Sequence, residues 1–190
     1  RVSAKRLFPN FSFQDAPFNA EYYQPGHPET EIAYMGCRTR VMSNVHDPSR
    51  AQTWGRGNLS FTSINLPRLA IEAHHDVDAF FASYDRMIDL VIDQLLERLK
   101  IQSHKLVRNF PFLMGQGVWI DSEKLRADDS VAEVLKHGTL SVGFIGLAET
   151  LTALIGAHHG ESEEAQQLGL RIVGHLRERL QDGAGRTGLD

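Results

Sequence analysis

The sequence has one cysteine among its 190 residues, no strong excess of charge of either sign and no long hydrophobic run. A single thiol, Cys37, excludes a disulfide within the chain and fits a reducing cytosol. The net charge of −4 gives no general attraction to nucleic acid or to anionic membranes. No apolar run approaches the ~18 residues that a membrane-spanning helix needs, and no basic stretch followed by an apolar one opens the chain. These features predict a cytoplasmic protein with neither nucleic acid nor a membrane among its partners.

The composition, 42% hydrophobic and 23% charged, is that of a globular protein. This length allows one domain with a sizeable core. The chain starts at Arg1 instead of a methionine, and residues 182–190 form no closing element. We therefore expect residues 1–190 to be part of a longer polypeptide.

Strand-like and helical patterns alternate along the chain. Strands are predicted in three places: within the first 36 residues, where Leu7, Phe11 and Phe13 would share a buried face, over 58–68, ending near Pro67, and over 112–119. Amphipathic helices are predicted from Asp76, as N-cap, to Arg98 and Lys100, over 122–137, over 147–155, and after Ser162 with Leu168, Ile172, Val173, Leu176 and Leu180 on one face. This alternation predicts an α/β architecture with crossover connections.

Cys37 follows a glycine and precedes Arg38 and Arg40. Gly36 gives the backbone freedom for a tight turn, and the arginines make the surroundings electropositive, which favours thiolate or redox chemistry. The alternative is a small buried hydrophobic residue with no chemical role.

The segment from Gly138 to Gly146 is rich in glycine and precedes a predicted helix. A turn at this place would present free backbone N–H groups to a phosphate. The segment is neither a Walker A loop nor a dinucleotide-binding fingerprint. Close packing between a strand and a helix would also account for the glycines.

Two asparagines, Asn58 and Asn65, fall in the predicted strand 58–68, although asparagine is depleted in strand interiors. Each must find hydrogen-bond partners if buried, so it either braces a loop or faces a ligand. In a regular strand Ser60 and Thr62 would share a face with Asn58.

Two histidine pairs, His74-His75 and His158-His159, could hold a metal ion. The sequence has no H-E-x-x-H motif, and one cysteine cannot build a cysteine-based zinc site. Adjacent side chains diverge on a strand or a helix, so we expect loop or cap roles and no metal site.

Several longer stretches together resemble one family, the anaerobic (class III) ribonucleoside-triphosphate reductases. They are residues 34–39, 57–68 and 137–149, with the opening Phe8-Pro9-Asn10-Phe11 and the stretch 158–161. The resemblance runs in order over nearly the whole chain. It implies that residues 1–190 form part of a ten-stranded α/β barrel of the glycyl radical enzyme and ribonucleotide reductase type, in which a finger loop carries the catalytic cysteine into the barrel.

The resemblance also implies roles for individual residues in the anaerobic reduction of ribonucleoside triphosphates for DNA synthesis. Cys37 would be the thiyl radical that takes hydrogen from C3′ of the ribose, with formate as the expected reductant. Asn58 matches the family asparagine near the sugar and the reductant. The substrate phosphates would lie against Ser141, Val142, Gly143, Phe144, Ile145 and Gly146.

Other parts of such an enzyme are missing from this sequence. The family needs a C-terminal glycyl radical, installed by a radical SAM iron–sulfur activase, a four-cysteine zinc site and an N-terminal region that binds ATP and deoxynucleotide effectors. We expect a homodimer for the full-length enzyme, no cofactor in this segment and no turnover by the segment alone.

Three alternatives stay open. Other glycyl radical enzymes, of the formate-lyase or dehydratase type, commonly carry a second cysteine beside the radical cysteine or a glutamate two residues after it. This sequence has Gly36, Arg38 and Thr39 there and so lacks the base that a dehydratase would use. A non-catalytic nucleotide-binding module would use the Gly138 segment, with Cys37 as packing. A metal hydrolase using the histidine pairs lacks the ligand spacing.

Overall fold

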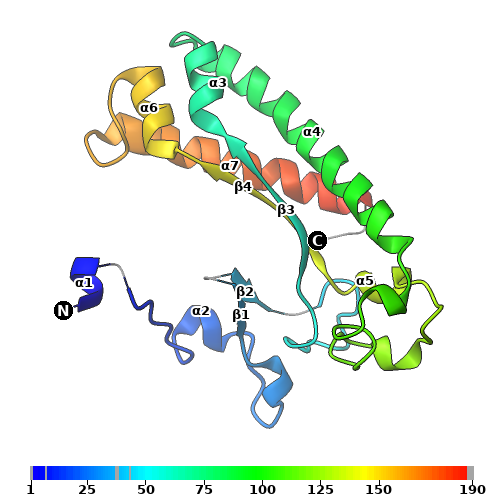
Figure 1. Ribbon diagram of the computed structural model, residues 1–190. Helices are drawn as coiled ribbons and strands as arrows, with labels where there is room; N and C mark the ends of the chain where they lie inside the picture. Colours follow the sequence, from blue (N-terminus) through cyan, green and yellow to red (C-terminus); the bar gives the residue numbers. More distant parts are fainter. Residues whose placement is uncertain (1, 7, 37–38, 43, 188–190) are drawn as a thin grey trace. The chain divides into compact units, whose positions relative to one another are not determined.

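The structure is a computed structural model that describes residues 2–6, 8–36, 39–42 and 44–187. The chain divides into two compact units, residues 1–57 and 58–190 (Figure 1). Cys37 and Arg38 lie outside the described residues. No helix among the described residues is long and apolar enough to span a membrane.

The first unit consists of short elements: α1 (Val2–Arg6), α2 (Pro17–Ala20), the 3₁₀ helix η1 (Pro28–Thr30), β1 (Ala33–Met35) and β2 (Thr39–Val41). Strands β1 and β2 pair antiparallel. Side-chain hydrogen bonds connect β2 to α2 and to the loop before it. Arg40 Nη1 donates to Asn19 Oδ1 of α2 (2.9 Å), and Asn19 Nδ2 donates to Phe13 O (2.7 Å).

The strand predicted around Leu7, Phe11 and Phe13 is wrong. Residues 8–13 have no regular secondary structure, and the side chains of Phe11 and Phe13 are 73% and 70% exposed. Leu7 lies outside the described residues. A strand is stable only with a partner, and in this unit β1 and β2 pair with each other.

The second unit holds a pair of strands and four longer helices. Its elements are β3 (Asn58–Asn65), α3 (Leu66–Glu72), α4 (Val77–Ser103), η2 (Val107–Asn109), η3 (Ser122–Lys124), α5 (Ala132–Leu135), β4 (Thr139–Ile145), α6 (Leu147–Ile155) and α7 (Glu163–Thr187). Strands β3 and β4 pair in parallel, which confirms the predicted crossover connection. Whether the pair belongs to a ten-stranded barrel stays a prediction.

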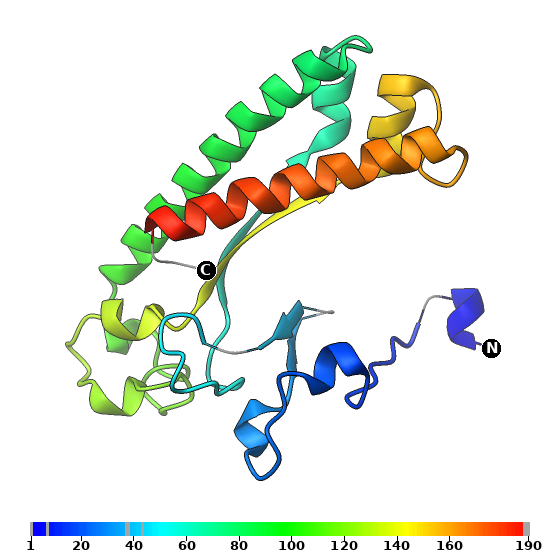
Figure 2. The ribbon, with the colours of Figure 1, turned by 180° about the vertical axis from the view of Figure 1, so that it is seen from behind.

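The core of this unit lies between the helices and one face of the strand pair. The two long helices, α4 and α7, lie on the same side of the strands (Figures 1 and 2). Buried side chains from β3, α3, α4, α6 and α7 form one cluster: Ile64, Leu66, Leu69, Ala70, Ala73, Phe80, Phe81, Tyr84, Ile88, Val91, Leu95, Leu151, Leu154, Ile172 and Leu176. The apolar residues of α4 that recur every three or four positions are therefore buried on one face of the helix, as an amphipathic helix predicts.

The predicted cap of α4 and the predicted end of β3 are confirmed, whereas one residue predicted on the buried face of α7 is exposed. Asp76 caps α4, because its Oδ1 accepts a hydrogen bond from the backbone N–H of Ala79 (2.9 Å). Strand β3 ends at Asn65, which agrees with the predicted end near Pro67. Pro67 itself lies in the first turn of α3, where its missing N–H costs nothing. Val173, predicted on the buried face of α7, is 38% exposed.

Two predicted elements between α4 and β4 are wrong. Residues 112–119 form turns, with Gly117 at φ +69° and Gly115 so close to Pro111 O that an added Cβ would lie 2.6 Å from it. The helix predicted over 122–137 shrinks to η3 and the four residues of α5. Local side-chain bonds compete with the helix there: Asp129 Oδ2 accepts from the Arg126 N–H (2.8 Å).

Tyr84 is fully buried in the core where α4 meets α7. Its ring lies 5.7 Å from that of Phe80 and 5.9 Å from that of His175, measured between centroids. The hydroxyl of Tyr84 has no hydrogen-bond partner among the described residues. Burial raises the pKa of Tyr84 from 10.0 to about 12 because the phenolate cannot be solvated.

We expect Tyr84→Phe to raise the free energy of unfolding by about 1 kcal/mol at neutral pH, because it removes a buried hydroxyl without a partner. The raised pKa of Tyr84 also makes the free energy of unfolding of the parent chain depend on pH. The contribution from the protonated phenol is complete below pH 10 and is lost as the pH rises towards 12. Urea unfolding followed by circular dichroism measures both effects. The control is Tyr23→Phe, at an exposed position. An equal alkaline loss of stability in the parent chain and in Tyr84→Phe would contradict the assignment.

Candidate functional site

One face of the β3–β4 pair is left open by the described helices of the second unit. Phe61 of β3 is 70% exposed and Ile145 of β4 is 55% exposed. The parallel register places Phe61 beside Ser141, Ser63 beside Gly143 and Asn65 beside Ile145. Since paired residues of neighbouring strands point to the same side, this open face carries Ser141, Gly143 and Ile145 of the predicted site. The side chains of Val142 and Phe144 point the other way and pack against the hydrophobic core.

Asn58 and Ser141 meet on this open face. The side-chain Nδ2 of Asn58 donates a hydrogen bond to Ser141 Oγ (2.8 Å), which joins residues 83 positions apart in the sequence. Among the described residues, the Oδ1 atom of Asn58 accepts no bond from the protein. Asn58 thus braces β4 with one atom and has a second polar atom available for a ligand.

Ser60 and Thr62 do not share a face with Asn58, so that prediction is wrong. The pairing shifts register between Asn58 and Ser60. Ser60 Oγ and Thr62 Oγ1 accept hydrogen bonds from Arg98 Nη1 on α4 (3.2 and 3.3 Å). These two hydroxyls therefore face the helix layer, away from Ser141.

The glycine-rich segment is a strand for most of its length and not the predicted turn. Ser141, Val142, Gly143, Phe144 and Ile145 belong to β4, where the main chain pairs with β3. Gly146 alone of the six predicted phosphate contacts stands at a helix start, as the N-cap of α6 with φ +75°. The acid Glu149 follows in the first turn of α6, where it already complements the helix dipole.

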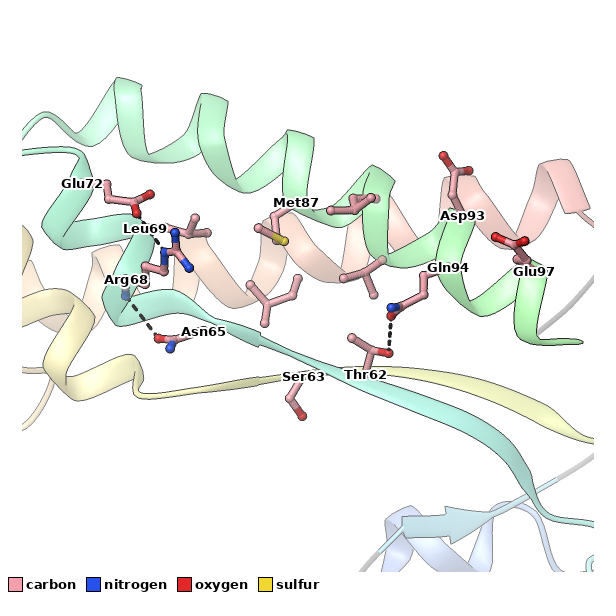
Figure 3. Close-up of a pocket in the computed structure, with 13 residues that line it drawn as sticks. Thr62, Ser63, Asn65, Arg68, Leu69, Glu72, Met87, Asp93, Gln94 and Glu97 are labelled. Atoms are coloured by element: carbon pink, nitrogen blue, oxygen red, sulfur yellow. Dashed lines mark hydrogen bonds and ion pairs between the residues drawn. The ribbon is translucent and has the colours of Figure 1, made fainter.

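Gly146 fits closely against the start of the neighbouring helix. A Cβ atom added to Gly146 would lie 2.3 Å from Pro67 Cγ. Asn65 caps that helix, α3, because its Oδ1 accepts from the Arg68 N–H (3.2 Å; Figure 3). Asn65 therefore braces the start of α3, and close packing against Pro67 explains why residue 146 is a glycine. Two helices start side by side at the carboxyl ends of two parallel strands, where α/β proteins commonly bind ligands.

The histidine pairs have loop and cap roles. His74 and His75 adopt positive φ values of 49° and 68° between α3 and α4, and His75 Nδ1 donates to Leu154 O (3.2 Å). His158 Nδ1 accepts from the Gly160 N–H (3.0 Å) in the loop before α7. Within the described ranges, no group of three or more histidine, cysteine, aspartate or glutamate side chains could hold a metal ion.

The position of Cys37 falls between β1 and β2, outside the described residues. Gly36, directly before it, has φ +53°, and a Cβ atom added there would meet nothing within 4 Å. This left-handed backbone agrees with the tight turn predicted at Gly36.

Comparison with known proteins decides the family. The family model described as anaerobic ribonucleoside-triphosphate reductase matches residues 1–190. The chain belongs to this family. The reductase of Salmonella typhimurium is 34% identical over 157 residues, and that of Escherichia coli 33% identical over 157. Each match covers 81% of this chain and 22% of the relative.

A reductase of bacteriophage T4 is 25% identical over 164 residues, which are 83% of this chain and 25% of that protein. The chain therefore spans about a fifth to a quarter of the length of these relatives. The resemblance inferred from the sequence is confirmed at the level of the anaerobic reductase family.

Sequence reasoning missed a polar stripe on α4 that this reductase segment uses to hold β3. Gln94, Arg98 and Gln102 lie four residues apart, and each bonds to β3. The spacing was a usable signal, because residues at i, i+4 and i+8 share one helix face.

We expect Gly146→Ala to destabilise the reductase segment by about 2 kcal/mol or more, because alanine is strained at positive φ and its Cβ would overlap Pro67. Thermal unfolding measures the change. The matched control is Gly174→Ala inside α7, where a Cβ meets nothing within 4 Å. That change should be stabilising by up to ~1 kcal/mol through helix propensity. Equal effects of both substitutions would disprove the close approach at Gly146.

Proposed function

We propose that this chain forms part of the catalytic barrel of an anaerobic ribonucleoside-triphosphate reductase. The complete enzyme would convert ribonucleoside triphosphates to deoxyribonucleoside triphosphates for DNA synthesis. The observation that carries the proposal is the family match over all 190 residues. The contact between Asn58 and Ser141, two residues selected from the sequence for this chemistry, supports it.

Cys37 is the proposed hydrogen abstractor. As a thiyl radical its sulfur takes one hydrogen atom from C3′ of the ribose, and the 2′-hydroxyl then leaves as water. The departing hydroxyl takes up one proton to become water. Formate, the proposed reductant, supplies two electrons and one hydrogen and is oxidised to carbon dioxide, so that C2′ gains a hydrogen in place of the lost oxygen. The thiol then returns the hydrogen atom to C3′, which restores the thiyl radical. The support is the position of Cys37 in the matched segment, after Gly36 and before Thr39.

Asn58 is the proposed partner of the ribose and the reductant. A neutral amide can donate to one oxygen and accept from another without acting as a base. Its Nδ2 bonds to Ser141, and its Oδ1 can accept from a sugar hydroxyl on the open face. The amide also carries no charge that would repel an anionic reductant such as formate.

The triphosphate is proposed to lie towards the start of α6. Free N–H groups and the helix dipole favour anions there, and the Gly146 N-cap keeps the approach free of a side chain. Ser141, Gly143 and Ile145 would then line the path from sugar to phosphates on the open face. Val142 and Phe144, also predicted for this role, instead pack their side chains against the hydrophobic core. Glu149 in the first turn opposes the anion, so bound cations or basic groups from elsewhere in the enzyme would have to offset it.

The remaining cofactors and partners are proposed to act through other parts of the complete enzyme. These are the glycyl radical and the radical SAM activase that installs it, the ATP and deoxynucleotide effectors, the zinc site and a second subunit. The glycyl radical would supply the unpaired electron that Cys37 needs. This chain would contribute the thiol, the amide and one wall of the nucleotide site.

We expect Cys37→Ser in the complete reductase to abolish deoxynucleotide formation, because an O–H bond is too strong to replace the thiol in hydrogen abstraction. Nucleotide affinity should change less than about twofold, since the hydroxyl is nearly isosteric. Asn58→Ala should lower kcat at least about a hundredfold, by analogy with removing one hydrogen-bonding group that acts on a reacting group. Product analysis and equilibrium binding measure the two quantities.

Retained reduction by Cys37→Ser would overturn the radical role. It would favour a non-catalytic nucleotide-binding module in which Cys37 only packs. Loss of nucleotide binding together with turnover would point to a folding defect, which circular dichroism of the variant identifies.

The isolated 190-residue chain should form no deoxynucleotide, even with an activating enzyme, ATP and formate, because the proposed radical source lies elsewhere. Chromatographic detection of deoxynucleotide from labelled substrate measures this. The positive control is the complete reductase under the same conditions. Product above background from the isolated chain would contradict the proposed division of labour.

A further inference from the structure

A single unpaired residue, Leu59, interrupts the pairing of β3 with β4. Asn58 is opposite Thr139 and Ser60 is opposite Leu140, so two steps along β3 correspond to one step along β4. This is the arrangement of a β-bulge, which redirects the side chains next to it. The bulge explains why Asn58 points to Ser141 while Ser60 points to Arg98.

The main chain of the bulge is held from α4. Gln102 Nε2 donates a hydrogen bond to the carbonyl oxygen of Leu59 (3.1 Å). That carbonyl belongs to the residue without a partner in the strand register, so a side chain of α4 holds the bulge itself. One helical turn earlier, Arg98 Nη1 donates to the carbonyl of Phe61 (3.2 Å).

The side chain of Leu59 is held as well. It packs against the second hydrophobic cluster of this unit, which includes Val107, Trp119 and Leu135. Gly138 leaves the room that it needs, because a Cβ added there would lie 2.6 Å from Leu59 Cγ. The bulge is thus fixed at its carbonyl and at its side chain, on the side of the strands away from Ser141.

We propose that Gln102 is a positioning residue for the reductase reaction: by holding the carbonyl of the Leu59 bulge, it aims the Asn58 amide at the open face. The inference rests on the role of Asn58 in the proposed function. Gln102 touches no substrate and acts only through the backbone next to the residue that carries the Asn58 side chain. Without the amide donor, Leu59 returns towards regular pairing, and Asn58 turns towards the helix layer.

The helix offers a matched pair of positions for the test. Gln94 lies on the same face of α4, two turns before Gln102, and its Oε1 accepts from Thr62 Oγ1 (3.1 Å; Figure 3). Glutamate at 94 keeps that acceptor, whereas glutamate at 102 replaces the donor with an acceptor that repels Leu59 O. Both substitutions replace glutamine by glutamate within α4, so they change the charge and the size of the side chain equally.

The experiment compares Gln102→Glu, Gln94→Glu, Gln102→Leu and Gln102→Lys in the complete reductase that contains this segment. The readouts are kcat and the Kd for a ribonucleoside triphosphate. We expect Gln102→Glu and Gln102→Leu to lower kcat about tenfold, because small misplacements of a reacting group cost rate. Nucleotide Kd should stay within about twofold in both. Gln102→Lys keeps an N–H donor and should recover kcat to within about threefold of the parent enzyme, and Gln94→Glu should match the parent.

Equal losses of kcat in Gln94→Glu and Gln102→Glu, or no loss in Gln102→Glu and Gln102→Leu, would overturn the positioning role. Failure of Gln102→Lys to recover kcat would also overturn it, since a donor would then not be what matters. Asn58→Ala separates this inference from the proposed function. If Asn58→Ala loses turnover and the Gln102 variants do not, only the positioning role falls; if Asn58→Ala keeps full turnover, the role of Asn58 itself falls.

Discussion

The parallel hydrogen-bond ladder between β3 and β4 is the interaction on which the second unit depends. Parallel strands cannot be joined by a tight turn, so the chain must cross over between them. The crossover contains α3, α4 and the loops of the second hydrophobic cluster. It returns the chain in a register that sets Ser141 beside Phe61 and within reach of Asn58. A slip by one residue would send every side chain of one strand to the other face.

The two faces of this strand pair have different chemistry. The covered face packs Ile64 and its neighbours against α4 and binds two strand hydroxyls through Arg98. The open face carries Asn58, Ser63 and Asn65 among exposed apolar side chains. A polar and partly apolar open face is what a nucleotide site needs, since such sites are mostly apolar with a few placed polar groups. The change from one face to the other occurs at the Leu59 bulge, because Asn58 before it bonds to Ser141 on the open face and Ser60 after it bonds to Arg98 on the covered face.

The sequence predicted the parts of the fold that repeat a pattern. The buried stripe of α4, its Asp76 cap, and the bounds of α6 follow from spacing and capping chemistry alone. The predictions are wrong at places where a single local interaction determines the backbone conformation. Gly117 adopts a left-handed backbone in a stretch that has strand composition. The side chain of Asp129 closes a turn in a stretch that was predicted to be a helix.

The sequence supplied candidate residues for the site, but it did not predict how those residues lie relative to one another. Asn58, Ser141 and Gly146 were selected from motifs, but a regular strand would have put Asn58 with Ser60. The bulge that separates them depends on Gln102, which is 43 residues away from Leu59 in the sequence, and on the absent side chain of Gly138. Pairing registers of this kind depend on tertiary contacts, which a single sequence does not display.

The most direct test is an experimental structure of the complete reductase with a bound ribonucleoside triphosphate. We expect the Asn58 amide to lie within hydrogen-bonding distance of the ribose, with the phosphates towards Gly146 and the start of α6. A nucleotide bound away from the open face of β3 and β4, or an Asn58 side chain turned towards α4, would contradict this expectation.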